Sequence, residues 1–304
     1  MIHLDGHYVS NGDKNVFMRI LGEGKPAVLF EPDLGGLAVE WAEIQSKVAE
    51  FATTISYDRP GYAESPLSDK IRTAPAIATE LYNALTNSNV QEPYIIVGHG
   101  YGGLIAQLFA KMNPRDAHAL VLVDPYTQFD PELDNLDLPK YNDTLSMKVK
   151  MDNIRKYTEI EKKEFEKQMS PMLTELYKEF PSELSSFLVA YQSDVRLYKS
   201  IIAEYDSLKD SLELLNEIPA NPDIPVKILA RDYELMIDAG KQIGLPEEEA
   251  HAVEEQRLQS LKKLSDQYQQ SEISVVKGAN QSMHYTRPET IIETIKELVD
   301  GFDS

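Results

Sequence analysis

Short apolar runs alternate with segments whose apolar residues recur every three or four positions. Stripes such as Ile77, Leu81 and Leu85 have helical spacing. The intervening runs are long enough for strands buried on both faces, and they cover residues 27–30, 53–57, 94–97, 120–123, 225–230 and 273–276. Regular alternation of this kind predicts an α/β fold with a mostly parallel, doubly wound sheet.

The two ends of the chain extend this pattern in different ways. Residues 6–9 and 16–20 flank a turn at Asn11-Gly12, which predicts two antiparallel edge strands. Near the other end, a Glu-rich stripe predicts a long helix over 246–269. A closing helix is expected over 288–299, with Pro288 in its first turn.

The middle of the chain breaks the alternation. Residues 126–219 are rich in Glu, Lys, Met and Tyr, and they have helical spacing without a clear strand. We therefore expect a helical cap, or lid, inserted at the carboxyl edge of the sheet. On this interpretation, residues 1–125 and 220–304 form the core, and 126–219 form the cap.

Composition narrows the partners and the chemistry. With 30 basic and 50 acidic residues among 304, the chain carries a formal charge of −20 and no cysteine. Because such an acidic surface repels nucleic acid and anionic lipid, neither is expected as a partner. Thiol chemistry is excluded, and no residue pattern calls for a cofactor. Without a basic and apolar leader, the sequence predicts a cytoplasmic protein.

The most specific motif is Val97-Gly98-His99-Gly100-Tyr101-Gly102-Gly103, between a predicted strand and helix. It matches the G-x-S-x-G nucleophile elbow except at Gly100, where Ser, Asp or Cys is expected. The same residues also spell the dinucleotide-binding pattern G-x-G-x-x-G. In a dinucleotide-binding fold, that pattern follows the first strand and precedes an acidic residue by about 20 positions. Here it follows several predicted strands, so the nucleophile elbow is favoured.

Three further segments support the elbow assignment, namely 30–36, 57–66 and 278–288. With the elbow, they resemble in order the oxyanion loop, the D-R-x-G-x-G-x-S segment and the histidine loop of the α/β-hydrolase superfamily, in its esterase and lipase-like branch. The resemblance covers nearly the whole chain outside the cap. It implies the α/β-hydrolase fold and, in relatives, hydrolysis of esters, amides or lactones.

The same resemblance shows where this chain departs from its relatives. Gly100 stands at the nucleophile position, and Gln281 stands seven residues before Pro288, where relatives carry the catalytic histidine. Asp33, Leu34 and Tyr101 fall in the oxyanion-hole region. Glycine is usual near position 33, and a carboxylate there opposes an oxyanion unless it points to solvent.

Two remaining triad assignments stay open. Asp232, with Glu234 as the alternative, follows the strand after the cap, where the resemblance implies the orienting acid; a plain turn-capping role fits Asp232 equally. His284 falls where relatives carry a second, non-catalytic histidine, and we place it with the binding residues. A metal site at His3, Asp5 and His7 is not expected from so local a cluster.

These residues favour a pseudo-hydrolase that binds a small, partly apolar molecule and possesses no serine-hydrolase triad. A protein partner is also compatible with this reading. The alternatives are an enzyme that uses Asp33, His99 or His284, and an esterase inactivated by engineering at Gly100 and Gln281.

Overall fold

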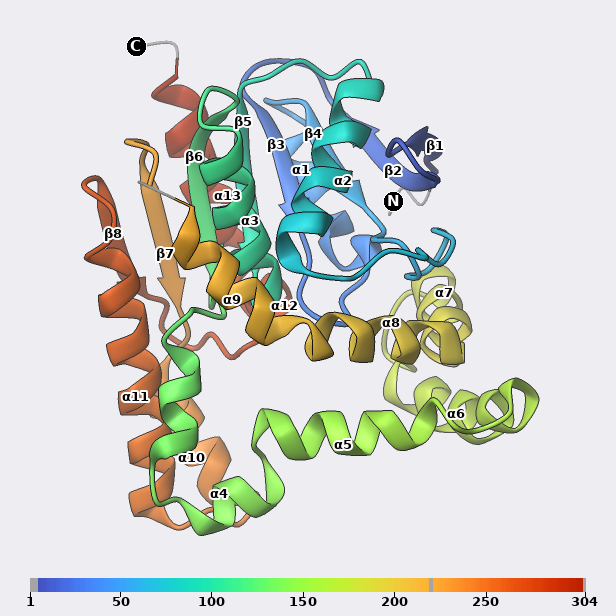
Figure 1. Ribbon diagram of the computed structural model, residues 1–304, viewed down its shortest axis with the longest axis vertical. Coiled ribbons are helices and arrows are strands. Elements are labelled where there is room, and N and C mark those ends of the chain that lie inside the picture. Colours follow the sequence, from blue (N-terminus) through green and yellow to red (C-terminus); the bar gives the residue numbers. More distant parts are fainter. Residues whose placement is uncertain (1–4, 219–220, 303–304) are drawn as a thin grey trace.

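The computed structural model describes residues 5–218 and 221–302, and its centre is an eight-stranded sheet (Figure 1). The strand order is β1-β2-β4-β3-β5-β6-β7-β8. The strands β1 and β2 pair antiparallel, as do β2 and β4, and every other neighbouring pair is parallel. The strands are β1 His7–Ser10, β2 Asn15–Leu21, β3 Ala27–Glu31, β4 Thr54–Tyr57, β5 Tyr94–His99, β6 Ala117–Val123, β7 Val226–Ala230 and β8 Ser271–Val275. The predicted parallel sheet and antiparallel edge are confirmed.

Helices cover both faces of the sheet, because the central strands are apolar on both sides. Leu29 and Ile96 pack on one face with α2 Ala74–Asn87, α3 Tyr101–Met112 and α11 Glu247–Ser265. Val28 and Val97 pack on the other face with η1 Ala38–Trp41, α1 Ala42–Val48 and α13 Pro288–Asp300. Alternate residues of one strand thus belong to two separate cores, as the pleat of a buried strand requires.

The register of β3 and β5 determines what meets at the carboxyl edge of the sheet. Phe30 lies opposite Val97, and Glu31 lies opposite Gly98. The two strands therefore end side by side. The residues that follow them, including Asp33 and Gly100, are brought together there although they are far apart in the sequence.

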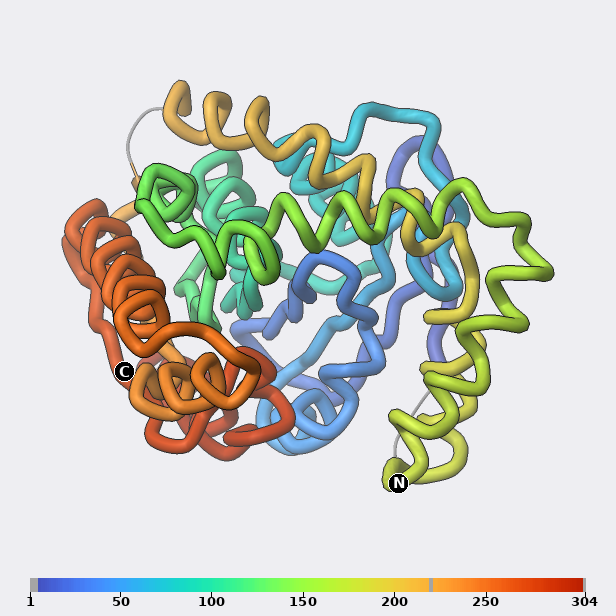
Figure 2. Tube along the Cα trace, turned by 90° about the horizontal axis from the view of Figure 1, so that it is seen from below, coloured from blue at the N-terminus to red at the C-terminus, as the bar shows by residue number. Residues whose placement is uncertain are grey.

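In the segment predicted as a cap, the described residues 126–218 form helices joined by short loops and contain no strand. Its elements are η2 Asp130–Asn135, α4 Pro139–Thr144, α5 Met147–Tyr157, α6 Lys162–Leu176, α7 Ser182–Gln192, α8 Val195–Asp206 and α9 Leu208–Glu217. In Figure 1, α5 and α8 lie beyond the carboxyl edge of the sheet, and Figure 2 shows α5 in light green crossing that end of the molecule. The division into a core and a separate cap stays a prediction.

Two helices in the carboxyl-terminal part of the chain were not predicted. Tyr233–Gln242 form α10, directly after β7, and the expected Glu-rich helix is α11, which ends at Ser265. Within α10, Ile237 and Gly240 are the buried residues. The short helix α12, Met283–Thr286, lies within the predicted histidine loop.

Candidate functional site

The turn between β5 and α3 has the backbone conformation of a nucleophile elbow. Gly100 has φ of +51° and ψ of −122°, values that residues with side chains rarely adopt. On either side, Gly98 and Gly102 lie so close to neighbouring backbone that a Cβ on either would overlap it. Strand and helix therefore approach each other closely at this turn, and the residue at the apex has no side chain to present.

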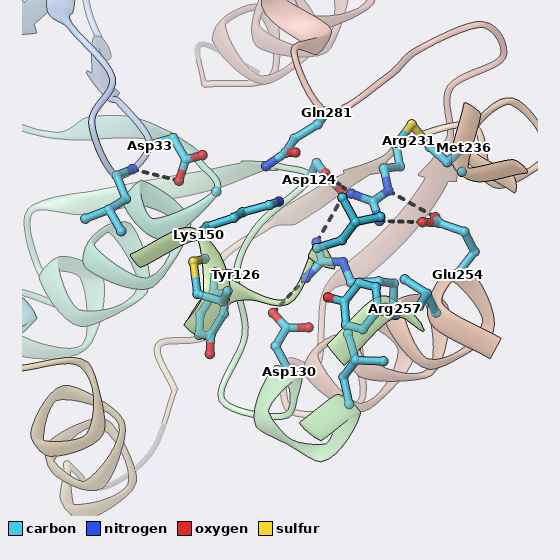
Figure 3. Close-up of a pocket in the computed structure, with 18 of the residues that line it drawn as sticks. Asp33, Asp124, Tyr126, Asp130, Lys150, Arg231, Met236, Glu254, Arg257 and Gln281 are labelled. Carbon is cyan, nitrogen blue, oxygen red and sulfur yellow. Dashed lines mark hydrogen bonds and ion pairs between the residues drawn. The ribbon is translucent and has the colours of Figure 1, made fainter. Parts of the chain in front are cut away.

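The carboxylate of Asp33 occupies the space in front of Gly100. Its Oδ1 accepts hydrogen bonds from two backbone N–H groups, that of Leu34 at 2.7 Å and that of Tyr101 at 2.6 Å. A Cβ built on Gly100 would overlap this carboxylate. Of the two orientations considered from the sequence, Asp33 thus has the inward one (Figure 3). The two amides of the oxyanion-hole region hold its negative charge.

A buried arginine fixes the backbone that carries Asp33. The Arg59 guanidinium donates to the carbonyl oxygens of Pro32 and Asp33, each at 2.7 Å. It also binds the carboxylate of Glu31 at 2.7 Å and that of Glu204 at 3.2 Å, and all three side chains are fully buried. Because Glu204 belongs to α8, one arginine ties the Asp33 loop both to the sheet and to the helical segment above it.

Gln281 reaches the same region from the opposite side. Its carbonyl oxygen lies 2.8 Å from His99 Nε2, which anchors its loop beside the elbow. The Gln281 side chain is exposed and lines the cavity described below; in Figure 3 it extends from its loop toward Asp33. An amide there can donate and accept hydrogen bonds but cannot take a proton from water near neutral pH.

The two candidate acids differ in their surroundings. Asp232 is buried, and its Oδ2 accepts from the Gly278 N–H at 2.8 Å, at the start of the loop that carries Gln281. That hydrogen bond, together with the Lys277 ammonium, holds the pKa of Asp232 below its usual range. Glu234 is exposed and pairs with Lys277 at 2.7 Å. Asp232 is thus the acid that contacts the loop, although it does not line the cavity.

His284 lies behind the cavity rather than in it. Its ring is 5.0 Å from that of His99 and 5.5 Å from that of Trp41, between centroids. Neither ring nitrogen has a hydrogen-bond partner among the described residues. Burial, with a smaller contribution from His99, lowers the pKa of His284 to about 3, so the imidazole is neutral. His284 therefore packs like a core residue, and its predicted part in binding stays a prediction.

A cavity of about 340 Å³ opens over Asp33, Gly100 and Gln281. Its volume suits a small organic molecule. One part of its wall is apolar and includes Leu145, Met147, Leu208, Met236, Ile243 and Val253. These residues come from the helical segment 126–218, from α10 and the turn that follows it, and from α11, so the unpredicted helix α10 is a wall of the site. The other part of the wall is charged.

The charged wall is a network that sequence reasoning missed. Arg231 binds both oxygens of Glu254, at 2.6 and 3.0 Å, and lies 3.4 Å from Asp124. Arg257 bridges Asp124, at 3.3 Å, and Asp130, at 2.8 Å. Although burial opposes it, the two guanidinium groups lower the pKa of Asp124. Asp124 directly follows β6, and Arg231 directly follows β7. Their positions at the carboxyl edge of the sheet were the sequence signal that could have identified them as site residues.

Lys150 is the cavity cation outside this network. It lies on α5, and within the described part of the chain no ion pair joins it to an acid. Its side chain extends between Asp33 and Asp124 (Figure 3). Desolvation lowers the pKa of Lys150, and the charge of Arg231 lowers it further, whereas Asp33 opposes both. A ligand would therefore meet one ammonium group that is not already neutralised.

The family follows from a match over most of the chain. The model of the alpha/beta hydrolase family matches residues 28–294. The chain belongs to this family. Among curated proteins, the uncharacterized protein YqjL of Bacillus subtilis (strain 168) is 32% identical over 104 residues, which are 34% of this chain and 41% of YqjL. The abhydrolase domain-containing protein abhd-5.2 of Caenorhabditis elegans is 30% identical over 113 residues, 35% of this chain and 25% of that protein. The aligned regions therefore span less than half of these relatives.

Solved structures of α/β-hydrolases match along almost the whole chain. The epoxide hydrolase CorEH is 17% identical, with a TM-score of 0.68, and the match covers 98% of this chain and 99% of that one. An esterase from Exiguobacterium antarcticum is 14% identical, with a TM-score of 0.67 and coverage of 97% and 100%. At these identities the likeness establishes the α/β-hydrolase fold alone.

Two further points concern this α/β-hydrolase as a whole. Within residues 5–218 and 221–302, no three His, Cys, Asp or Glu side chains are grouped so that they could hold a metal, and His3 lies outside the described residues. In the same part of the chain, no helix combines the length and apolar character needed to cross a bilayer.

Proposed function

We propose that this α/β-hydrolase-fold protein binds a small, partly apolar molecule in the cavity and does not carry out the serine-hydrolase reaction. The observation that carries the proposal is the Asp33 carboxylate on the Leu34 and Tyr101 amides, in front of an elbow that ends in Gly100. Acyl transfer needs a nucleophile at the elbow and free donors for an oxyanion. Here the nucleophile is absent, and an anion of the chain itself occupies the donors.

The surroundings support a lasting arrangement. Arg59 holds the carbonyls of Pro32 and Asp33 from a fully buried position. Because this loop is held so firmly, a small movement would not free the Leu34 and Tyr101 amides for an oxyanion. The proposal takes the protein to act in the cytoplasm on a small-molecule ligand, with a protein partner as a further possibility and without nucleic acid or membrane.

Reactivity toward a fluorophosphonate probe tests the proposal. We expect no labelling, because a fluorophosphonate needs a hydroxyl activated by a base and Gly100 supplies none. Intact-mass measurement would show this, with an active serine esterase as the positive control. A ligand co-purified with the protein and identified by mass would support the binding role. Stoichiometric labelling of any cavity residue would overturn the proposal.

The second candidate is an enzyme that uses other groups, for which Asp33, His99 and His284 are the possible residues. Of these three, only Asp33 lines the cavity. His99 Nε2 donates to the backbone carbonyl of Gln281, and His284 is buried next to the His99 ring. A catalytic role therefore favours Asp33, and the chemistry open to that carboxylate is different from acyl transfer.

A further inference from the structure

We propose that Asp33 is a nucleophile toward small molecules that carry an electrophilic saturated carbon, such as an alkyl halide or an epoxide, and that it captures them as an ester through Oδ2. This inference rests on the proposed function in one respect, since both take the cavity as the ligand site. It goes further by assigning a covalent step to a residue outside the elbow.

The geometry of Asp33 carries the proposal. Both N–H groups of the oxyanion-hole region bind the same oxygen, Oδ1, at 2.6 and 2.7 Å. The other oxygen, Oδ2, accepts no hydrogen bond within the described residues, and Asp33 lines the cavity. A carboxylate held in this way has one oxygen fixed and one available to attack. It also stands where a side chain at position 100 would have placed a nucleophile.

The cavity offers a seat for the electrophile and a place for its leaving group. An apolar body would pack against side chains such as Met147 and Leu208, which lie in the same cavity wall. Lys150 and Gln281 reach into the space beside Asp33 (Figure 3). An ammonium and an amide can both donate hydrogen bonds to a departing anion.

The step is balanced for both electrophiles. An electron pair of Asp33 Oδ2 forms the new C–O bond. With a halide, the carbon–halogen pair leaves with the halogen, as a halide ion beside the Lys150 ammonium. With an epoxide, the ring C–O bond breaks and the oxygen takes a proton from that ammonium, which leaves Lys150 neutral. The lowered pKa of Lys150 favours this transfer.

Release of the captured group needs a base, and Gln281, which stands at the family's histidine position, is not one. Lys150, left neutral when an epoxide opens, regains its proton from water and is then an ammonium again. Hydrolysis requires that water lose a proton as it attacks the ester carbonyl, and Gln281 cannot accept it. The charge that develops on Oδ1 would be stabilised by the Leu34 and Tyr101 amides. The site therefore has an oxyanion hole for hydrolysis without the base, so capture should be stoichiometric and lasting.

The test uses 1,2-epoxyhexane and 1-bromohexane with the full chain. We expect one covalent equivalent by intact mass, an ester on Asp33 by peptide mapping, and its removal by hydroxylamine. In Asp33→Asn the side-chain oxygen can still accept from both amides, and the adduct should be lost. Asp143→Asn alters an exposed carboxylate on α4 outside the cavity lining and should retain it. An adduct mapped elsewhere, or one that survives in Asp33→Asn, would overturn the inference.

Two further measurements separate the possible failures. Gln281→His supplies a base, so the adduct should decay and hexane-1,2-diol should accumulate beyond one equivalent, whereas the parent stops at one. Binding of hexane-1,2-diol to the parent is measured by calorimetry. If the diol binds and neither electrophile reacts, the nucleophile assignment is wrong and the binding function stands. If the diol does not bind and nothing reacts, this inference fails and the proposed cavity function loses its support as well.

Discussion

Gly100 and Asp33 constrain each other directly. The φ of +51° at position 100 would cost a residue with a side chain about 1–3 kcal/mol. A Cβ there would also overlap the Asp33 carboxylate. The inward orientation of Asp33 therefore requires a glycine at position 100. A residue with a side chain at position 100 would have both the backbone strain and the overlap with the Asp33 carboxylate.

His284 predicts how stability depends on pH. Its folded-state pKa of about 3 lies below the ordinary value of 6.5, so between these values the unfolded chain binds the proton more strongly. The contribution to stability is complete above pH 6.5 and is lost as the pH falls toward 3. We expect the free energy of unfolding to fall less between pH 8 and pH 5 in His284→Phe than in the parent, as measured by urea titration at both pH values. An unchanged or steeper loss would contradict a buried, neutral imidazole.

The sequence predicts these positions better than their side-chain directions. Gly100 and Gln281 could be assigned because motif spacing fixes which residue stands at the elbow and in the loop. The direction of Asp33 could not, because it depends on the N–H of Tyr101, 68 residues away in the sequence. Similarly, the spacing that singled out His284 says nothing of the Trp41 and His99 rings that bury it.

One buried carboxylate of α8 binds the core directly. Glu204 lies 3.2 Å from the Arg59 guanidinium and accepts from the Tyr62 hydroxyl at 2.9 Å, and its side chain is fully buried. Arg72 lies 3.9 Å from the same carboxylate. Removing Glu204 would break the Arg59–Glu204 ion pair and leave the buried Arg59 Nε and Tyr62 hydroxyl without their acceptor, beside the loop that carries Asp33. This helix is therefore anchored to the core at its carboxyl-terminal end.

We expect Glu204→Ala to reduce the free energy of unfolding by about 3–5 kcal/mol, the cost of breaking a buried ion pair by removing one partner. Asp206→Asn is the matched control, two residues further along α8. Asp206 pairs with Arg155 while both side chains are about half exposed, and the loss should stay below about 1 kcal/mol. Urea titration of both variants measures the difference. Equal losses would show that Glu204 is not the anchor.

Strands and amphipathic helices were predictable because their apolar periods are local. The helix α10 buries only Ile237 and Gly240, and its place in the cavity wall appears only when it lies against α11. The helices of 126–218 were predictable as helices. Their attachment was not, since Glu204 looks like any other acidic residue of a Glu-rich segment until Arg59 is seen beside it.

The carboxyl edge of the sheet brings these parts into one site. Because β3 and β5 end in register, the loop after one lies against the elbow after the other. The ends of β6 and β7 place Asp124 and Arg231 side by side at 3.4 Å. Order along the sheet therefore explains why residues from distant segments of the chain share a cavity. A chain with this sheet order has the framework of a hydrolase, whatever residues stand on it.

That framework can be tested by restoring a triad. The change Gly100→Ser with Gln281→His supplies a nucleophile and a base, and Asp232 is the acid implied by the resemblance. In the structure this double variant is obstructed, because the new side chain would overlap the Asp33 carboxylate and that carboxylate would still hold the Leu34 and Tyr101 amides. Adding Asp33→Gly removes both obstacles at once.

We therefore expect hydrolysis of p-nitrophenyl acetate from the triple variant and little from the double variant. Loss of one oxyanion donor costs about 10²–10³ in rate, so freeing two donors should raise the rate by about 100-fold or more. The matched control carries Ala in place of Ser at position 100 and lacks only the hydroxyl. Since triad members act as a unit, it should fall to the level of the parent. Equal rates in the double and triple variants would mean that the Asp33 carboxylate leaves the two amides when a substrate binds. The carboxylate would then not block the oxyanion hole permanently.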